Sequence, residues 1–349
     1  MTRREVLAAA GMLPALLSPV GADNTNRQGK RGIGASSAGF GMRIRANKEA
    51  QPPVDFVDYG HSLALGGVET SLPSNDSESA RNLRRKLESY NMRVIFNAAL
   101  HTEPDLPTFE ALVKAAKEAD AYGLRLAMTG RRYEEFDSFE AFKANFERCQ
   151  KIIALAEPIL RKHQVRLAIE NHKGWRAAEQ AAWMKRLSSE WVGVLFDFGN
   201  NLAFCEDPME TLRTLQPYIL SCHIKDMAVE KYEEGFLMSE VPLGDGFLDL
   251  KQMVDVLRQK NPDMAFDLET ITRDPLKIPV FTDKYWATFD DAYSPYPAHD
   301  LAKMLEFVRA HPPKKPLPRT SGLSPKQQLD LEDEANLKSI VYARQHLEL

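Results

Sequence analysis

Four apolar segments of this chain end on an acidic or histidine side chain, and this arrangement limits the possible folds more than any other feature. The segments end at Glu170, Asp197, His223 and Glu269, and each end is preceded by a mostly apolar run. Such runs are typical of buried β-strands, where an isolated charge costs several kcal/mol unless a partner or a metal ion compensates. We therefore expect the four strand ends to share one partner.

The spacing of these four residues predicts a barrel. They lie 27, 26 and 46 residues apart. One strand–helix unit of a (β/α)8 barrel takes roughly 25–30 residues, so the first two spacings place one group on each of three successive strands. The last spacing is longer because we expect residues 227–248 to form an extended loop. Strand ends meet at one face of such a barrel, and a single shared site follows.

From residue 33 onward, short apolar runs alternate with amphipathic helical stretches. This alternation predicts a (β/α)8 TIM barrel over residues 33–311. Asp76 and Asp207 are expected to cap two of the helices. The expected strands lie at 66–70, 92–97, 124–128, 165–170, 192–198, 219–224 and 265–269, with the first strand somewhere in 33–45. The expected helices lie at 53–64, 77–90, 108–121, 138–163, 177–187, 208–215, 249–258 and 301–310.

The N-terminal segment, residues 1–22, reads as an export signal. Arg3 and Arg4 open it, an apolar run from Val6 to Leu17 follows, and small residues near Ala22 suit cleavage. The paired arginines resemble a twin-arginine signal, with an ordinary secretory signal or an uncleaved anchor as alternatives. We therefore expect a periplasmic or exported protein with no stable membrane insertion after cleavage. Residues 23–32 are polar and predict a flexible start to the mature chain.

Two segments lie outside the strand–helix count. Residues 274–300 form a long loop after the last strand, and their many aromatic residues favour a role over the barrel mouth, either as core or in stacking on a sugar ring. Residues 312–349 form a C-terminal extension with a helix at about 324–346. That helix is expected to pack on the outside of the barrel or on a second subunit, so a homo-oligomer stays possible.

The charge and composition exclude some classes of partner. The net charge is −4, which gives no reason to expect nucleic acid as a partner. The fractions of hydrophobic (44%) and charged (27%) residues are ordinary for a soluble globular protein. Three cysteines without metal-site spacing do not make a disulfide framework, and Cys222 is expected to be a core residue.

The four strand-end residues suggest which metal they would hold. Three carboxylates and one imidazole are an oxygen-rich set that suits Mn²⁺, Mg²⁺ or Co²⁺, with Zn²⁺ less favoured by ligand type. A single acidic residue at a strand end is more often a cap or an ion-pair partner, and a single histidine in an apolar run is more often a core residue. Their joint occurrence at repeated positions favours a shared metal site.

Five short motifs carry a resemblance to a known family. The chain resembles the xylose-isomerase-like superfamily of sugar isomerases and epimerases over roughly residues 33–310. The motifs are Ile169–His172, Phe196–Asn200, His223–Asp226, Pro242–Gly246 and Leu268–Thr270.

The resemblance implies a site and a chemistry. It implies that the four strand-end residues hold one divalent metal, often Mn²⁺, and that Glu170 and Glu269 also act as acid and base. The implied activity is isomerisation or epimerisation of a sugar or keto-sugar through an enediolate that the metal stabilises. The same enediolate permits a lyase or dehydratase reaction on a keto-sugar, a 3-keto-glycoside or a keto-inositol.

Two other functions are weighed against this one. In a non-catalytic sugar-binding barrel we would expect one or more of the four metal ligands to be replaced, whereas all four residues are present. DNA-repair endonucleases of similar fold need additional strand-end histidines, and this chain has only eight histidines in all. Export also favours a small carbohydrate without a phosphate group.

Further residues near strand ends are candidates for substrate contacts. In many epimerases of the family a histidine stands where this chain has Asn200, so the contact made there is uncertain in kind. Glu69 and Arg132 are open between substrate contact and loop ion pair. The candidates for substrate binding are His101, His172, Trp175, Asn200, Lys225 and Asp226.

Overall fold

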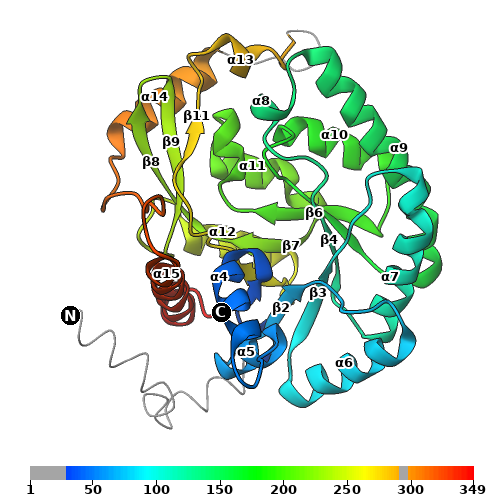
Figure 1. The fold of residues 1–349 in the computed structure, drawn as a ribbon. Helices are drawn as coiled ribbons and strands as arrows, with labels where there is room; N and C mark the ends of the chain where they lie inside the picture. Colours follow the sequence, from blue (N-terminus) through cyan, green and yellow to red (C-terminus); the bar gives the residue numbers. More distant parts are fainter. Residues whose placement is uncertain (1–28, 291–297) are drawn as a thin grey trace.

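Eight parallel strands close into a barrel at the centre of the molecule (Figure 1). The computed structural model describes residues 29–290 and 298–349, so the predicted signal at 1–22 lies outside the described residues. Around the barrel the order is β1-β10-β7-β6-β5-β4-β3-β2, and this confirms the predicted (β/α)8 fold. The barrel strands are β1 Gly34–Ser36, β2 Gly67–Thr70, β3 Arg93–Asn97, β4 Gly123–Leu126, β5 Leu167–Glu170, β6 Val192–Asp197, β7 Ile219–Ile224 and β10 Phe266–Leu268.

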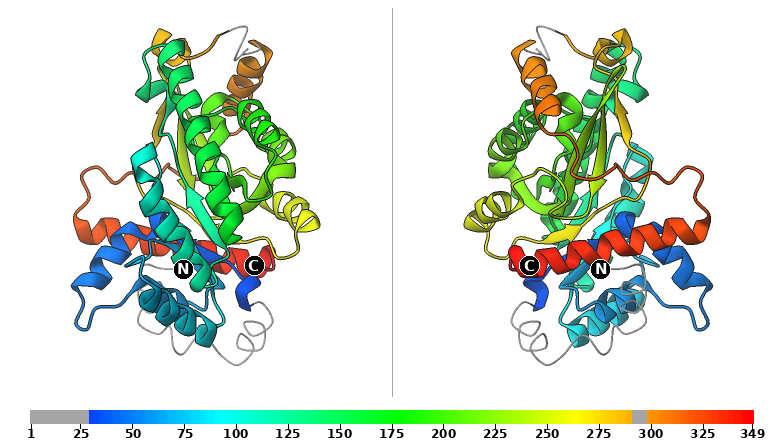
Figure 2. Two further views of the ribbon diagram at one scale, coloured as in Figure 1. Left: turned by 90° about the vertical axis from the view of Figure 1, so that its right-hand side faces the viewer. Right: turned by 90° about the vertical axis from the view of Figure 1, so that its left-hand side faces the viewer.

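Helices surround the barrel, as the side views show (Figure 2). Both predicted caps are confirmed, because Asp76 accepts from Ser79 N and Asp207 accepts from Glu210 N. Within the described residues, no helix is both long and apolar enough to cross a membrane. The helices are α4 Gly41–Glu49, α5 Phe56–Ser62, α6 Ser77–Tyr90, α7 Leu106–Glu118, α8 Arg132–Glu135, α9 Phe139–His163, α10 Ala177–Leu187, α11 Pro208–Leu215, α12 Leu250–Lys260, α13 Asp283–Trp286, α14 Ala298–Ala310 and α15 Pro325–His346.

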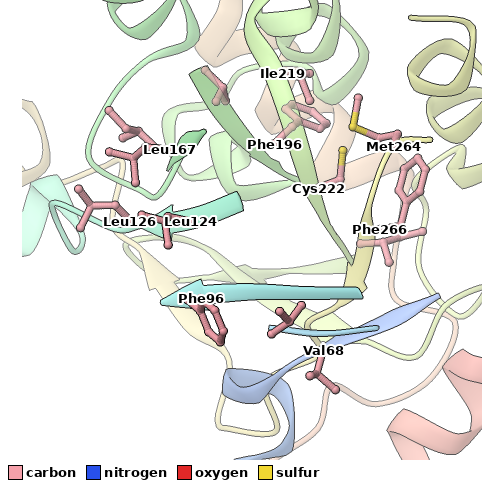
Figure 3. Packing of buried hydrophobic residues seen from close by; sticks show 14 of the residues in the cluster. Val68, Phe96, Leu124, Leu126, Leu167, Phe196, Ile219, Cys222, Met264 and Phe266 are labelled. Carbon is pink, nitrogen blue, oxygen red and sulfur yellow. The ribbon is translucent and has the colours of Figure 1, made fainter. Parts of the chain in front are cut away.

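The main hydrophobic core lies between the barrel strands and the helices. Apolar side chains of the strands, among them Val68, Phe96, Phe196 and Cys222, belong to one buried cluster (Figure 3). Each large apolar side chain buried in this way contributes about 1.5–3 kcal/mol. Successive side chains of a strand point to opposite faces, so the neighbours of these residues are the ones that can face the barrel interior. The expectation that Cys222 is a core residue is confirmed.

A buried ion pair forms part of the barrel interior. Arg93 lies 2.7 Å from Asp267, and both side chains are almost fully buried. Two glycines leave the space for this pair: a Cβ on Gly34 would lie 1.9 Å from Asp267 Oδ1, and one on Gly67 would lie 2.3 Å from Arg93 Cγ. The interior is therefore held partly by charge pairing and not only by apolar packing.

The prediction of an extended loop at residues 227–248 is wrong, because most of this segment is a β-hairpin. Strands β8 (Asp226–Tyr232) and β9 (Gly235–Val241) pair antiparallel, and β11 (Leu276–Ile278) extends them into a three-stranded sheet. Met227 and Val229 pack into a second apolar cluster on one face of this sheet. The charged run Glu230–Glu234, which lies at the turn between the two strands, favoured a loop in the sequence.

The segment 274–300 also contains regular structure. It supplies β11 and α13, and the closing helix α14 begins at Ala298, three residues before the predicted start. Tyr285 of this segment is fully buried in the second apolar cluster and packs against Tyr133. Tyr293 and Tyr296 lie outside the described residues. The first strand lies where it was expected, since β1 falls within residues 33–45, and α4 begins in the same range.

The C-terminal helix α15 packs on the barrel beside α4 (Figure 2). Glu332 accepts hydrogen bonds from the backbone of Met42 at 3.0 Å and of Arg43 at 2.7 Å, which are the first turns of α4. Ile340 and Ala343 are buried in the main core. Of the two predicted packing positions for this helix, the structure shows the one on the outside of the barrel.

Candidate metal centre

Four strand ends converge at the carboxyl-terminal end of the barrel. Glu170 ends β5, Asp197 ends β6, His223 lies on β7 and Glu269 directly follows β10. One donor atom from each side chain lies within 4.8 Å of the donor atoms of the other three, and all four side chains are buried. The register pairs Asp197 with His223 across β6 and β7. The structure therefore brings together the four residues predicted to share a metal ion.

Each carboxylate of this group has one oxygen held by a cationic side chain. Lys225 Nζ lies 2.9 Å from Asp197 Oδ2 and 2.9 Å from Glu269 Oε2. Arg125 Nε donates to Glu170 Oε2, also at 2.9 Å. By contrast, Asp197 Oδ1 has no hydrogen-bond partner among the described residues. The cations thus fix one oxygen of each carboxylate. The second oxygens of Glu170 and Glu269 accept only long hydrogen bonds, from Asn200 at 3.4 Å and from Ser36 at 3.5 Å.

The imidazole of His223 is held in the same way. Its Nε2 lies 2.7 Å from Glu69 Oε2, and Ser36 Oγ donates to Glu69 Oε1 at 3.0 Å. On the other side of the ring, Nδ1 lies 3.3 Å from Glu269 Oε1 without forming a hydrogen bond to it. A carboxylate on one ring nitrogen orients the other for metal binding. Glu69 therefore leaves His223 Nδ1 as the donor atom.

Two observations indicate that these residues fit a divalent metal ion. First, Asp197 Oδ1 and His223 Nδ1 are buried and have no hydrogen-bond partner within the described part of the chain, which is rare for buried polar atoms. One cation would give both atoms a partner. Second, carboxylate oxygens with one imidazole nitrogen are the donor set that Mn²⁺ and similar ions accept.

The electrostatics of the site favour the same conclusion. Burial raises the pKa of Asp197 to about 8, in spite of the neighbouring charge of Lys225. Burial acts in the same direction on Glu170, but the charge of Arg125 outweighs it and lowers the pKa of Glu170 to about 2. A divalent cation favours the ionised form of every carboxylate around it, so metal binding would remove the proton that burial places on Asp197.

Three of the predicted substrate-binding residues lie beside the ligands. Lys225 bridges two carboxylates, as described above. Asn200 donates to Asp197 and accepts from Lys173 Nζ at 2.5 Å. His172 Nδ1 lies 3.1 Å from the carbonyl oxygen of Gly130, and burial lowers the pKa of His172 to about 4, so this ring is neutral at pH 7.

Asp226 has a structural role, and the prediction that it contacts substrate is not supported. Its carboxylate accepts backbone hydrogen bonds from Gly244 at 3.0 Å, Gly246 at 2.9 Å and Leu248 at 3.1 Å. A Cβ on Gly246 would lie 2.1 Å from Asp226 Oδ1, so this close approach requires glycine. Asp226 therefore fixes the turn at 242–246.

Trp175 is a core residue, which corrects that prediction, whereas His101 is an exposed loop residue and its contact with substrate stays a prediction. His101 is exposed in the loop after β3, where its carbonyl oxygen accepts from Arg148. Trp175 is fully buried, with its ring 4.9 Å from that of Phe146 and 5.6 Å from that of Trp183. The chain turns away from the barrel mouth after Gly174, so this indole packs under α9 and α10 and has no face left for a sugar ring.

The structure gives the positions of Glu69 and Arg132, whose roles the sequence left open between substrate contact and loop ion pair. Glu69 is in the site, where it holds His223. Arg132 is fully buried and pairs with Glu179 at 3.0 Å, so it is an interior ion pair. Sequence reasoning missed Arg125 and Lys173, because neither belongs to a motif and each acts only through a contact with a residue of the neighbouring strand–helix unit.

Two curated proteins match parts of this chain. An uncharacterized protein of Escherichia coli, YihM, is 23% identical over 221 residues, which is 62% of this chain and 65% of YihM. The 3-oxo-isoapionate decarboxylase of Pectobacterium atrosepticum is 27% identical over 103 residues, or 29% of this chain and 38% of that enzyme. The chain thus spans less than two thirds of either relative.

Solved structures share the fold at low sequence identity. A xylose isomerase domain protein from Planctomyces limnophilus has a TM-score of 0.53 at 15% identity, covering 80% of this chain and 95% of that one. A probable 3-DHS dehydratase, AsbF, from Bacillus anthracis has a TM-score of 0.53 at 12% identity and covers 74% and 99%. A D-tagatose 3-epimerase-like protein has a TM-score of 0.51 at 12% identity and covers 80% and 98%.

The sequence itself gives the family. Residues 57–307 match the sequence model of the family described as the xylose isomerase-like TIM barrel. The matched range includes the four strand ends of the candidate metal centre. The chain belongs to the xylose isomerase-like TIM barrel family.

Proposed function

We propose that this protein is a metal-dependent isomerase or epimerase of a sugar or keto-sugar. The observation that carries the proposal is the pair of buried glutamates, Glu170 and Glu269, in one four-residue metal site. An acid–base pair of this kind suits proton transfer at the carbon next to a carbonyl group. Mn²⁺ is the metal we expect, with Mg²⁺, Co²⁺ or Zn²⁺ as alternatives.

The roles of the residues follow from their contacts. A divalent ion held by the four ligands would polarise the substrate carbonyl and so acidify the neighbouring C–H bond. Glu170 is kept ionised by Arg125, and burial raises the pKa of Glu269 less than His223 and Lys225 lower it. Both glutamates are therefore able to accept a proton. The ammonium group of Lys225, which already lies beside Glu269, would stabilise the negative charge of an enediolate.

The stereochemical outcome depends on which glutamate returns the proton. If Glu170 removes the proton and Glu269, after taking a proton from solvent, returns one to the opposite face of the same carbon, the centre is inverted. Return of the proton to the adjacent carbon gives isomerisation. The D-tagatose 3-epimerase-like protein above shares this fold and is named for epimerisation, which agrees with this class of reaction.

A lyase is the second candidate. Loss of a β-hydroxyl or of a carboxyl group from the same type of carbonyl substrate needs a nearby proton donor and a positive charge. The buried ammonium group of Lys173, which two hydrogen bonds connect to Asp197 through Asn200, meets this need. The names of a probable dehydratase and of a decarboxylase among the similar proteins agree with this alternative.

We also propose that the protein acts after export. The basis is the twin-arginine-type sequence at residues 1–22, since that route carries folded proteins with their cofactors in place. A periplasmic location favours a free or glycosidic carbohydrate as substrate. A fusion of residues 1–32 to a reporter that folds before transport tests this part, and a Lys-Lys replacement of Arg3 and Arg4 should abolish export.

Deuterium incorporation tests the proposed chemistry. The protein loaded with Mn²⁺ is incubated in D₂O with ketoses and 3-keto-glycosides, and mass and NMR spectra locate the deuterium. We expect deuterium at the carbon next to the carbonyl, with an epimer or isomer as product; an eliminated product would favour the lyase. Glu170→Gln and Glu269→Gln should stop the exchange, and Glu78→Gln, on the exposed face of α6, should not. A lack of exchange with every compound would favour a non-catalytic binding protein.

A further inference from the structure

Lys173 is a buried cation for which the protein supplies no carboxylate partner. Its side chain is 3% exposed, and its ammonium group donates to the amide oxygen of Asn200 at 2.5 Å. No acidic side chain in the described part of the chain forms an ion pair with it. Lys225, by contrast, lies 2.9 Å from each of two carboxylates. Unpaired buried charges are costly, so Lys173 calls for an anion that the chain itself does not provide.

The position of Lys173 places that anion next to the metal ligands. Asn200 accepts from Lys173 and donates to Asp197, so only one side chain separates the ammonium group from a ligand. Burial and the like charge of Lys225 lower the pKa of Lys173 to about 8. The negative charges of Asp197 and Glu240 act in the opposite direction on this pKa but offset only part of the effect of burial.

The solvent side of the site is also cationic. Arg125 pairs with Glu170, and Arg273 pairs with Glu240. In both pairs the guanidinium group reaches solvent, at 20% and 37% exposure, whereas the carboxylate is buried at 1% and 3%. A ligand that approaches from solvent therefore meets positive charge before it meets the carboxylates. Such an arrangement attracts anions.

The summed charge of the side chains around the centre also favours an anionic ligand. Five buried carboxylates surround the site, and four cationic side chains accompany them. A divalent metal ion would turn this balance into a net positive charge, which an uncharged sugar would leave uncompensated. The carboxylates are those of Glu69, Glu170, Asp197, Glu240 and Glu269, and the cations are Arg125, Lys173, Lys225 and Arg273.

We propose that the substrate is an anionic carbohydrate and that Lys173 binds its negatively charged group while the carbonyl end lies at the metal centre. This inference rests on the proposed function for the position of the carbonyl end. A carboxylate and a phosphate ester share the required chemistry. A carboxylate agrees better with export, because phosphorylated sugars are mainly cytoplasmic.

Three ketoses that differ only at carbon 6 test the proposal. D-Fructose is neutral, D-fructuronate carries a carboxylate, and D-fructose 6-phosphate carries a phosphate. Their binding to the Mn²⁺-loaded full chain is measured by calorimetry, separately from any turnover. We expect at least one of the two anions to bind about tenfold or more tightly than fructose, as a charge-assisted contact predicts. The tighter of the two anions identifies the source of the charge.

Variants of Lys173 decide whether this residue is the one responsible. Lys173→Gln should remove the preference for the anion, and Lys173→Arg should retain part of it. The matched control is Lys185→Gln, which removes an exposed lysine of α10. Mn²⁺ affinity and the thermal unfolding temperature, measured for each variant, show whether the site is intact. Because Lys173→Gln leaves no buried acidic side chain without its ion-pair partner, we expect this variant to fold.

The outcomes separate this proposal from the proposed function. If neither anion binds more tightly than fructose, or if Lys173→Gln keeps the full preference, the assignment of Lys173 is overturned. An anion preference that depends on Lys173, in a protein that exchanges no deuterium with any ketose, would retain the anion site and reject the enolisation chemistry. Deuterium exchange with fructose at the same rate as with both anions would support the enolisation chemistry and reject the anion site.

Discussion

The two halves of the barrel contribute to the metal centre in different ways. Strands β5, β6 and β7 and the residue after β10 supply the four candidate ligands, whereas β1, β2 and β4 supply Ser36, Glu69 and Arg125, which hold these side chains in place. Lys225 is the exception, since it lies in the second half and holds two carboxylates. The comparison teaches that a metal site depends on two kinds of residue: donors, which a metal contacts, and holders, which fix the donors. Their loss should have effects of different size.

The largest effect is expected for loss of a donor in the second half. Asp197→Asn keeps the shape of the side chain but removes a ligand charge. Because four ligands together supply the binding free energy, we expect Mn²⁺ affinity to fall on the order of 10²- to 10³-fold. Equilibrium dialysis measures it, with Asp263→Asn on the exposed surface as the control. Unchanged affinity would remove Asp197 from the ligand set.

A smaller effect is expected for the holder Glu69 in the first half. Glu69→Gln can still accept the hydrogen bond from His223 Nε2 but no longer stabilises its orientation by charge. Loss of such a partner typically weakens metal binding by about 10- to 100-fold. A loss as large as that of Asp197→Asn would mean that Glu69 is itself a ligand, and the distinction between the halves would fail.

Arg125→Met should change the pH dependence more than the affinity at neutral pH. The low pKa of Glu170 means that its ionised form contributes stability at pH values above the unfolded-state pKa, and that this contribution is lost only as the pH falls toward about 2. Without the Arg125 charge, the pKa of Glu170 rises. The pH at which Mn²⁺ binding is half lost should therefore increase by about one unit or more. A titration of Mn²⁺ affinity from acid to neutral pH that shows no shift would refute this role.

The smallest effect is expected for Ser36→Ala. This change removes one buried hydrogen bond to Glu69, worth about 1 kcal/mol, and so weakens metal binding about fivefold at most. Because Ser36 acts on Glu69, the double variant Ser36→Ala, Glu69→Gln should bind Mn²⁺ no more weakly than Glu69→Gln alone. Additive losses would show that Ser36 acts independently, for example through Glu269, which lies 3.5 Å from it.

The same comparison explains what could be read from the sequence. The donors are recognisable because a barrel puts them at one kind of place, the end of a buried strand, at a spacing set by the strand–helix unit. Glu170, Asp197 and His223 follow this rule, and the fold, the strand positions and the convergence of the four residues could all be predicted from it.

The holders have no such rule. Arg125 contacts Glu170 across 45 residues of sequence, and His223 contacts Glu69 across 154. Such contacts follow from the closure of the barrel, which no local pattern records. Trp175 shows the opposite error: its closeness in sequence to Glu170 suggested a place at the barrel mouth, but the chain turns between them, and the indole lies in the core.

The central claim is that four residues from the second half of the barrel hold one divalent metal ion, with His223 bound through Nδ1. Anomalous diffraction from crystals grown with Mn²⁺ tests this most directly. We expect a single strong peak about 2.0–2.3 Å from oxygens of Glu170, Asp197 and Glu269 and from His223 Nδ1, with Nε2 still paired to Glu69. A strong peak elsewhere, or no peak between these four side chains at saturating Mn²⁺, would contradict the account.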